Sequence, residues 1–212
     1  MYLTKTPEFV QKMFPNLVWK VKANSSKTIY LSFDDGPIPE ITPWVLDLLK
    51  SYSAKASFFC VGENVSKNPE IYSRILNEGH SVGNHTHTHI SGWKSKNLDY
   101  FRDVQNCQEL VQSNLFRPPY GRLKKKQALF LQRKYQVIMW DVLSGDFDRG
   151  LSKELCLENV LNKTSEGSIV VFHDSIKAKD KLQFVLPEML SHFSEKGYSF
   201  KNLEVLNQEF KN

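Results

Sequence analysis

Two aspartates stand side by side at the end of an apolar segment. Asp34 and Asp35 follow residues 28–33, in which apolar and polar side chains alternate as in a half-buried strand. Adjacent carboxylates repel each other, and each resists burial unless a cation or a hydrogen-bond donor compensates its charge. Gly36 and Pro37 predict a tight, stiff turn directly after the pair. The two acids therefore require a compensating group elsewhere in the fold.

Four of the six histidines lie in one short segment, GHSVGNHTHTH, at residues 79–89. His85 and His89 are four residues apart, so at the start of a helix both imidazoles would lie on one face, a spacing that suits zinc or a similar divalent ion. Histidine-rich segments also occur as ordinary polar loops, and this pattern alone leaves metal binding open. A nearby carboxylate favours a metal site.

The paired acids and the histidines together explain each other. One aspartate can complete a His-His-Asp triad, while the other stays free of the metal and acts as a base. The cation would remove the penalty of placing two carboxylates together. Three protein ligands would leave open positions for water and substrate.

Strand-like and helix-like segments alternate along the chain. Strands are predicted at residues 28–33, 56–61, 80–83, 115–117, 136–141 and 168–172. Helices are predicted at residues 42–52, 69–78, 98–112, 127–134, 152–164 and 179–196. Repeated β/α units in one domain predict a parallel sheet, either a barrel or a doubly wound sheet.

Polar residues follow the predicted strands, and their position favours the barrel. They lie at or just past the carboxyl ends, where a β/α barrel carries its active site: Asp34, Asp35, Arg117, Asp141, Asp146 and His173. No glycine-rich phosphate loop follows any predicted strand, which disfavours a nucleotide-binding doubly wound sheet.

The bulk composition excludes several classes of protein. With 212 residues, 41% hydrophobic and 24% charged, the chain is long enough for one substantial core and is not disordered. The net charge of +5 permits anionic partners, but the one dense basic run, RLKKK, has no nucleic-acid-binding motif with it. Three cysteines, odd in number and far apart, predict buried thiols rather than disulfides or a zinc ribbon.

The first residues, MYLTKTPEFVQKMFP, contain no unbroken apolar segment. No part of the chain reaches the roughly 20 consecutive apolar residues that a membrane-spanning helix needs. We therefore expect no transmembrane segment and a cytoplasmic location. These patterns do not define the oligomeric state.

Four motifs, SFDDGP, HTHTH, RPPYG and VFHD, occur in an order and spacing that resemble the polysaccharide deacetylase family, the NodB-homology domains of carbohydrate esterase family 4. The resemblance implies a distorted (β/α) barrel of about seven parallel strands with surrounding helices, and metal-dependent removal of acetyl groups from N-acetylated sugars. It begins at residue 28. We therefore expect residues 1–27 to form an N-terminal extension packed on a deacetylase domain of residues 28–212.

The resemblance also implies the roles of the metal-binding half of the site. Asp34 matches the catalytic base, and Arg117 matches the arginine that orients it. Asp35, His85 and His89 match the three ligands of one divalent ion, with zinc as the first choice and cobalt, nickel or manganese as alternatives.

The second half of the site would stabilise the reaction intermediate and protonate the leaving group. The backbone N–H of Tyr120, after Pro119, matches the donor to the tetrahedral oxyanion. His173 matches the general acid, and Asp146 matches the carboxylate that tunes it. Burial alone would lower the pKa of His173, whereas a carboxylate within hydrogen-bonding reach would raise it again.

The chain departs from the family pattern at three positions. The fourth motif usually reads Asp-x-x-Asp-Trp, but LSGDF places Leu143 at the first aspartate and Phe147 at the tryptophan. Val171 replaces the usual leucine of the fifth motif. Phe147 and Val171 can still line an acetyl-sized apolar pocket, and Asp141 could replace the missing aspartate. Trp93, in a polar stretch after the histidines, could either cover the site or pack locally.

Three functions use these residues. We favour a metal-dependent deacetylase of N-acetylated sugars or glycans. The first alternative is a deacylase or amidohydrolase of a small non-glycan molecule. The second is a non-catalytic homologue that binds a glycan without turnover, which the presence of both a base and an acid disfavours.

Overall fold

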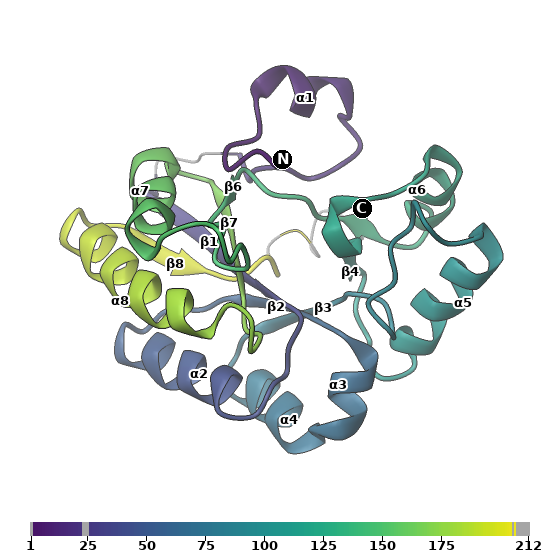
Figure 1. Cartoon of the computed structure of the whole chain (residues 1–212), viewed down its shortest axis with the longest axis horizontal. Helices are drawn as coiled ribbons and strands as arrows, with labels where there is room; N and C mark the ends of the chain where they lie inside the picture. The colour runs from purple at the N-terminus through teal and green to yellow at the C-terminus, as the bar shows by residue number, and fades with distance from the viewer. Residues whose placement is uncertain (1, 23–25, 205, 207–212) are drawn as a thin grey trace.

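A parallel sheet forms the centre of the computed structural model, which describes residues 2–22, 26–204 and 206 (Figure 1). Seven strands lie in the order β5-β4-β3-β2-β1-β7-β6, and β8 pairs with the beginning of β1. The strands are β1 (Thr28–Asp34), β2 (Ser57–Cys60), β3 (Ser81–Asn84), β4 (Leu115–Phe116), β5 (Gln136–Val137), β6 (Val142–Leu143), β7 (Ile169–His173) and β8 (Ser199–Lys201). All their pairings are parallel. The predicted distorted barrel of about seven parallel strands is confirmed.

Strand β1 lies at the centre and is buried on both faces. All of its seven residues are buried. Ile29, Leu31 and Phe33 face the main hydrophobic core, and Tyr30 belongs to a second buried cluster. The prediction of a half-buried strand is therefore wrong here, because helices cover one side of a parallel sheet and the curled sheet encloses the other.

Helices surround the sheet, most of them on its outer side (Figure 1). They are α1 (Glu8–Met13), α2 (Ile41–Ser51), α3 (Gly62–Lys67), α4 (Pro69–Asn77), α5 (Asn97–Gln108), α6 (Lys125–Leu131), α7 (Lys153–Lys163) and α8 (Lys179–Glu195). The six predicted helices are confirmed with small shifts at their ends, whereas α1, α3, β6 and β8 were not predicted. Helices α2 and α8 bury apolar residues in the same core as β1. A helix packed in this way has an amphipathic pattern that the sequence reveals.

One predicted strand is wrong. Residues 136–141 form not one strand but β5 and the approach to β6, with residues 138–141 crossing between them. The N-terminal segment binds the backbone of this crossing, since the N–H of Met139 donates to the oxygen of Val18 (2.7 Å) and the N–H of Thr6 donates to the oxygen of Asp141 (2.9 Å). Apolar residues here are buried without belonging to a continuous ladder.

The N-terminal residues lie along both ends of the seven-strand path. Lys5 forms an antiparallel bridge with Val142 of β6, and Val18 forms a parallel bridge with Ile138, just after β5. The Nζ of Lys5 lies 2.7 Å from the buried carboxylate of Asp141, which also accepts a hydrogen bond from Ser168 at 2.5 Å. Asp141 is thus neutralised away from the predicted site and does not replace the missing aspartate. A domain boundary at residue 27 stays a prediction.

Two further expectations concern the chain as a whole. In the described ranges, no helix combines the length and apolar character needed to span a membrane. Cys60, Cys107 and Cys156 are free and buried, as predicted.

Candidate active site

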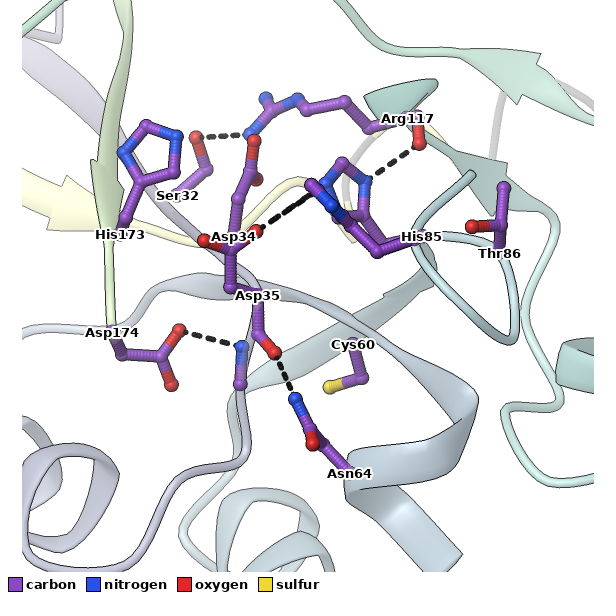
Figure 2. A network of polar contacts seen from close by, with 12 residues as sticks. Ser32, Asp34, Asp35, Cys60, Asn64, His85, Thr86, Arg117, His173 and Asp174 are labelled. Atoms are coloured by element: carbon purple, nitrogen blue, oxygen red, sulfur yellow. Dashed lines mark hydrogen bonds and ion pairs between the residues drawn. The ribbon is translucent and has the colours of Figure 1, made fainter. Parts of the chain in front are cut away.

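The predicted site residues converge at the carboxyl ends of the strands. Strands β1 and β7 pair in register, so that Asp34 lies beside His173. His85 follows β3, Arg117 follows β4, and Asp146 comes three residues after β6. Because neighbouring parallel strands end at the same edge of the sheet, residues far apart in the chain meet there (Figure 2).

The buried ion pair of Asp34 and Arg117 forms the floor of the site. The Nη1 of Arg117 donates to Asp34 Oδ1 at 2.6 Å and to Ser32 Oγ at 2.9 Å, and Nη2 donates to the oxygen of Met139 at 3.0 Å. The guanidinium also stacks on the ring of Phe59, 4.0 Å from the ring centroid. Arg117 is fully buried, so these contacts leave it one orientation, and it aims Asp34 (Figure 2).

The three predicted metal ligands gather in front of this pair. Asp35 Oδ1 lies 3.2 Å from His89 Nε2 and 3.8 Å from His85 Nε2. One ligand atom from each residue lies within 4.8 Å of the other two. Among the described residues, this is the one group of His, Cys, Asp or Glu side chains close enough together to hold a metal ion. Two imidazoles and one carboxylate are the donors that zinc and similar divalent ions prefer. The residues present therefore fit a metal ion.

The sequence placed the two histidines at the start of a helix, but the structure has no helix there. Residues 85–91 form a loop after β3, in which Thr86 and His89 have φ angles of 63° and 57°. The left-handed turns at these residues bring the two rings to a centroid distance of 5.1 Å. The four-residue spacing therefore works through a tight loop and not through one face of a helix.

His85 is oriented and kept neutral by its surroundings. Its Nδ1 lies 2.7 Å from the carbonyl oxygen of Arg117, a contact that places the ring proton on Nδ1 and leaves Nε2 free to bind a metal. Burial lowers the pKa of His85 to about 4. The same strand end that supplies Arg117 to Asp34 thus also orients this predicted metal ligand.

Asp35 owes its direction to an unusual backbone angle. Its φ of 86° turns the chain out of β1, and its carbonyl oxygen accepts a hydrogen bond from Asn64 Nδ2 at 2.7 Å (Figure 2). Burial would raise the pKa of Asp35, but the hydrogen bond from His89 and the charges of His173 and His85 outweigh it and hold that pKa well below its usual range. The Asp35 side chain is therefore anionic at neutral pH, the form that metal binding would require.

Gly36 is required for a reason other than the predicted one. The positive φ belongs to Asp35, whereas the N–H of Gly36 donates to the buried carboxylate of Asp174 at 3.0 Å. A Cβ on Gly36 would lie 2.0 Å from Asp174 Oδ2. Asp174 also accepts a hydrogen bond from Thr42 at 2.5 Å, and burial raises its pKa to about 8. Asp174 thereby anchors the turn that presents Asp35.

His173 and Asp146 form a second polar pair on the other side of Asp34. Asp146 Oδ1 lies 2.8 Å from His173 Nδ1, and Asp146 Oδ2 accepts the backbone N–H of His173 at 2.7 Å. Burial alone would lower the pKa of His173, but the charge and hydrogen bond of Asp146, with smaller contributions from Asp35 and Asp34, raise it to about 9. The imidazole is therefore protonated at neutral pH.

Of the predicted residues after the histidines, Tyr120 contacts His89, whereas Trp93 packs against the loop that follows Tyr120. Pro119 and Tyr120 follow β4, where Tyr120 has a φ of 61° and its ring lies 4.8 Å from that of His89. Trp93 is 58% exposed, donates from Nε1 to the oxygen of Leu123 and packs under the guanidinium of Arg122. Trp93 thus supports the loop after Tyr120, and these contacts favour local packing over covering the site.

The residues that depart from the family pattern lie around His173. Val171 is buried two residues before it on β7, and it pairs with Leu143 of β6. The ring of Phe147 packs edge-on against His173 at a centroid distance of 5.0 Å, and it also contacts the ring of Tyr2 at 5.0 Å. Phe147 therefore forms a wall beside the imidazole, and Val171 lies beneath it.

Sequence reasoning missed several residues that support the site. They are Ser32, Phe59, Asn64, Asp174 and Tyr2. Ser32 could have been found, because it lies two residues before Asp34 and so on the same face of β1. Asp174 directly follows His173 in the VFHD motif, but its contacts with Gly36 and Thr42 arise from the fold. For Phe59, Asn64 and Tyr2, nothing in the sequence neighbourhood indicates a contact with the site.

Comparisons with known proteins agree with this geometry. The model of the family described as "Polysaccharide deacetylase" matches residues 21–138. A peptidoglycan-N-acetylglucosamine deacetylase of Bacillus cereus is 32% identical over 90% of this chain and 92% of its own length. PgdA of Listeria monocytogenes, of the same name, is 34% identical over 89% of this chain but only 40% of its own length.

Solved structures show the same fold. A peptidoglycan N-acetylglucosamine deacetylase in complex with 4-naphthalen-1-yl-N-oxidanyl-benzamide has a TM-score of 0.85 at 30% identity, and the match covers 93% of this chain and 95% of that one. A CE4 family pseudoenzyme from Bacillus anthracis has a TM-score of 0.77 at 25% identity, over 89% of this chain and 67% of that one. The fold therefore occurs both in enzymes and in a pseudoenzyme.

The fold and the site define a hydrolase of the polysaccharide deacetylase class, which acts on C–N bonds other than peptide bonds. The chain belongs to the polysaccharide deacetylase family, carbohydrate esterase family 4, as the four motifs predicted.

We expect Gly36→Ala to lower the free energy of unfolding by about 1–3 kcal/mol, because the new Cβ must displace the buried carboxylate of Asp174. Chemical denaturation measures the effect. Gly150→Ala is the matched control, since its Cβ would meet nothing closer than 3.4 Å and its φ is not positive, so its stability should change by less than about 0.5 kcal/mol. Equal stability of the two variants would show that the turn does not depend on Asp174.

The two adjacent aspartates should differ in their effect on metal content. Asp35→Asn removes a ligand and should weaken zinc binding more than about tenfold, whereas Asp34→Asn should keep the metal. Zinc titration of the metal-free variants measures both, and circular dichroism checks their folding, because Asp34→Asn leaves Arg117 buried without its charge partner. Equal metal loss in the two variants would contradict the division of roles.

Proposed function

We propose that this protein removes acetyl groups from the N-acetylated sugars of a glycan, with Asp34 as the base and His173 as the acid. The observation that carries the proposal is the register of β1 and β7, which places these two residues side by side next to the cluster of Asp35, His85 and His89. The named relatives are peptidoglycan deacetylases, which supports an N-acetylated peptidoglycan sugar as the substrate class.

The base acts on water. A divalent ion held by Asp35, His85 and His89 would polarise the acetyl carbonyl and acidify a water molecule. Arg117 holds Oδ1 of Asp34, and no hydrogen bond from a described residue occupies its Oδ2, so this oxygen can accept the proton of the attacking water. The rigid guanidinium keeps that oxygen aimed, which saves reorganisation during the reaction.

The oxyanion requires a donor on the opposite side of the carbonyl. The backbone N–H of Tyr120 is our candidate, because the turn at Tyr120 lies against His89 and its φ of 61° departs from a regular strand or helix. A backbone donor costs no side-chain entropy, and its direction is set by the turn. Pro119 is buried, and its carbonyl oxygen accepts a hydrogen bond from the N–H of Arg122 at 3.2 Å across this turn.

The acid completes the reaction by releasing the amine. Nδ1 of His173 is occupied by Asp146, so Nε2 is the nitrogen that delivers a proton as the C–N bond breaks. Water and amide thereby become acetate and a free amino sugar. Asp34 and His173 each return to their starting state once the proton taken from water has been passed on.

Acetate release tests the proposal directly. The purified protein should release acetate from N-acetylglucosamine oligomers, and a chelator followed by added zinc should abolish and then restore the release. Asp34→Asn and His173→Ala should lower kcat by more than about 100-fold, because each removes a proton-transfer group. His192→Ala, on α8, is the matched histidine control and should retain activity.

Other outcomes would identify the two alternatives. Glycan binding without acetate release in the zinc-loaded protein would assign a non-catalytic binding role, as the existence of a CE4 pseudoenzyme illustrates. Release of acyl groups only from small non-glycan amides would assign the alternative amidohydrolase. A substrate panel with both classes separates them in one assay.

The pH profile should reveal the coupling of His173 to Asp146. The acid must be protonated, so kcat/KM should fall as the pH rises through the pKa of His173, which is about 9. In Asp146→Asn the charge that raises this pKa is lost while burial still lowers it, so the alkaline limb should move to lower pH by about one unit or more. Activity at pH 7 should fall as well. An alkaline limb that stays in place in Asp146→Asn, or persists in His173→Ala, would show that another group protonates the amine.

A further inference from the structure

An open cleft of about 810 Å³ lies next to His173 on the side away from the metal ligands. Phe147 is the wall that the two share: its ring contacts His173 at 5.0 Å and also lines the cleft. Tyr2 extends this aromatic wall, with a ring centroid 5.0 Å from that of Phe147. Aromatic faces of this kind are suited to packing against the apolar face of a sugar ring.

The rim of the cleft carries positive charge. Lys177 and Arg149 line this cleft and also a neighbouring hollow of about 540 Å³, where Lys181 joins them. Within the described residues, none of these three side chains forms an ion pair, and the Nζ of Lys177 lies over the ring of Phe147 at 5.6 Å. The cations therefore stand beside the aromatic wall without a direct ion pair, although the charges of Lys181 and Lys177 help to lower the pKa of the neighbouring Asp148.

The acids nearby offset only part of this charge. Asp148 accepts hydrogen bonds from Tyr2 Oη at 2.8 Å and from the N–H of Gly150 at 2.9 Å, so protein donors already engage both of its oxygens. Asp180 lines only the neighbouring hollow. Three basic groups thus oppose two acidic ones around the two hollows, and the net charge favours an anion.

The position of the cleft defines which part of a substrate could reach it. His173 protonates the nitrogen of the sugar that loses its acetyl group, so the sugar itself lies on the His173 side of the scissile bond. The next sugar of the same glycan would then extend past Phe147 into the cleft. We infer that this cleft binds a carboxylate-bearing sugar adjacent to the one that is deacetylated, with its ring on Tyr2 and Phe147 and its carboxylate at Lys177 and Arg149.

This inference rests on the proposed function, but binding can be measured without turnover. The Asp34→Asn protein, loaded with zinc, is titrated calorimetrically with two glycans of equal length: an N-acetylglucosamine oligomer, and an alternating oligomer in which every second sugar carries a carboxylate. The acidic oligomer should bind about five- to tenfold more tightly at low salt, and the preference should shrink as salt screens the contact. A third glycan, in which the carboxylates are converted to amides, should lose the preference.

Charge variants assign the preference to this cleft. In the Asp34→Asn background, Lys177→Gln with Arg149→Gln should remove the preference for the acidic oligomer and leave binding of the neutral one unchanged. Lys201→Gln is the matched control, because Lys201 is exposed on β8, which pairs with the beginning of β1 at the opposite end of the sheet. Equal affinity for the acidic and neutral oligomers, or a preference that survives the double variant, would overturn the inference. Absence of acetate release from the wild-type protein would instead reject the proposed function.

Discussion

The buried pair of Asp34 and Arg117 is the interaction on which the rest of the site depends. A guanidinium with no exposed surface needs partners for its donors, and here a carboxylate, a serine hydroxyl and the backbone carbonyls of residues 138 and 139 accept four hydrogen bonds from it. Removing one partner of such a pair costs about 3–5 kcal/mol, because the other charge is left buried and uncompensated. The pair also ties β1 and β4 to the chain between β5 and β6. The same contacts that satisfy Arg117 therefore connect these parts of the sheet at the level of the site.

Two histidines of the site have opposite electrostatic properties, and their neighbours are the reason. For His85, burial outweighs the opposing charge of Asp34 and the contact with the carbonyl oxygen of Arg117, and it lowers the pKa to about 4, so the ring is neutral, the form that metal binding requires. Burial acts in the same direction on His173, yet Asp146 raises its pKa to about 9 and it stays protonated. One residue type is thus neutral at one position of the site and protonated at another.

The N-terminal segment has a larger part in the structure than its position before the motifs indicates. Its residues bridge to β6 and to the chain after β5, so they occupy the place where a complete barrel would continue. Lys5 neutralises Asp141, and Tyr2 packs on Phe147, which stands where the family usually has a tryptophan. A smaller aromatic residue in the motif and an aromatic residue from outside it together form the wall beside His173.

The sequence by itself determined the class of fold, the four motifs and the identity of the polar residues. It could do so because the amphipathic helices and the central strands are local patterns, and because Asp34, Asp35, His85, His89 and His173 lie in short motifs of recognisable spacing. Only the tertiary structure decided how these residues are held. The loop conformation of residues 85–91, the burial of both faces of β1, and the contacts of Asp174 with Gly36 depend on chain segments more than a hundred residues apart or on backbone angles that no residue type specifies. Asp141 is the clearest example: its type and position suggested a site residue, but Lys5 and Ser168, brought beside it by the N-terminal segment and β7, give it a structural role.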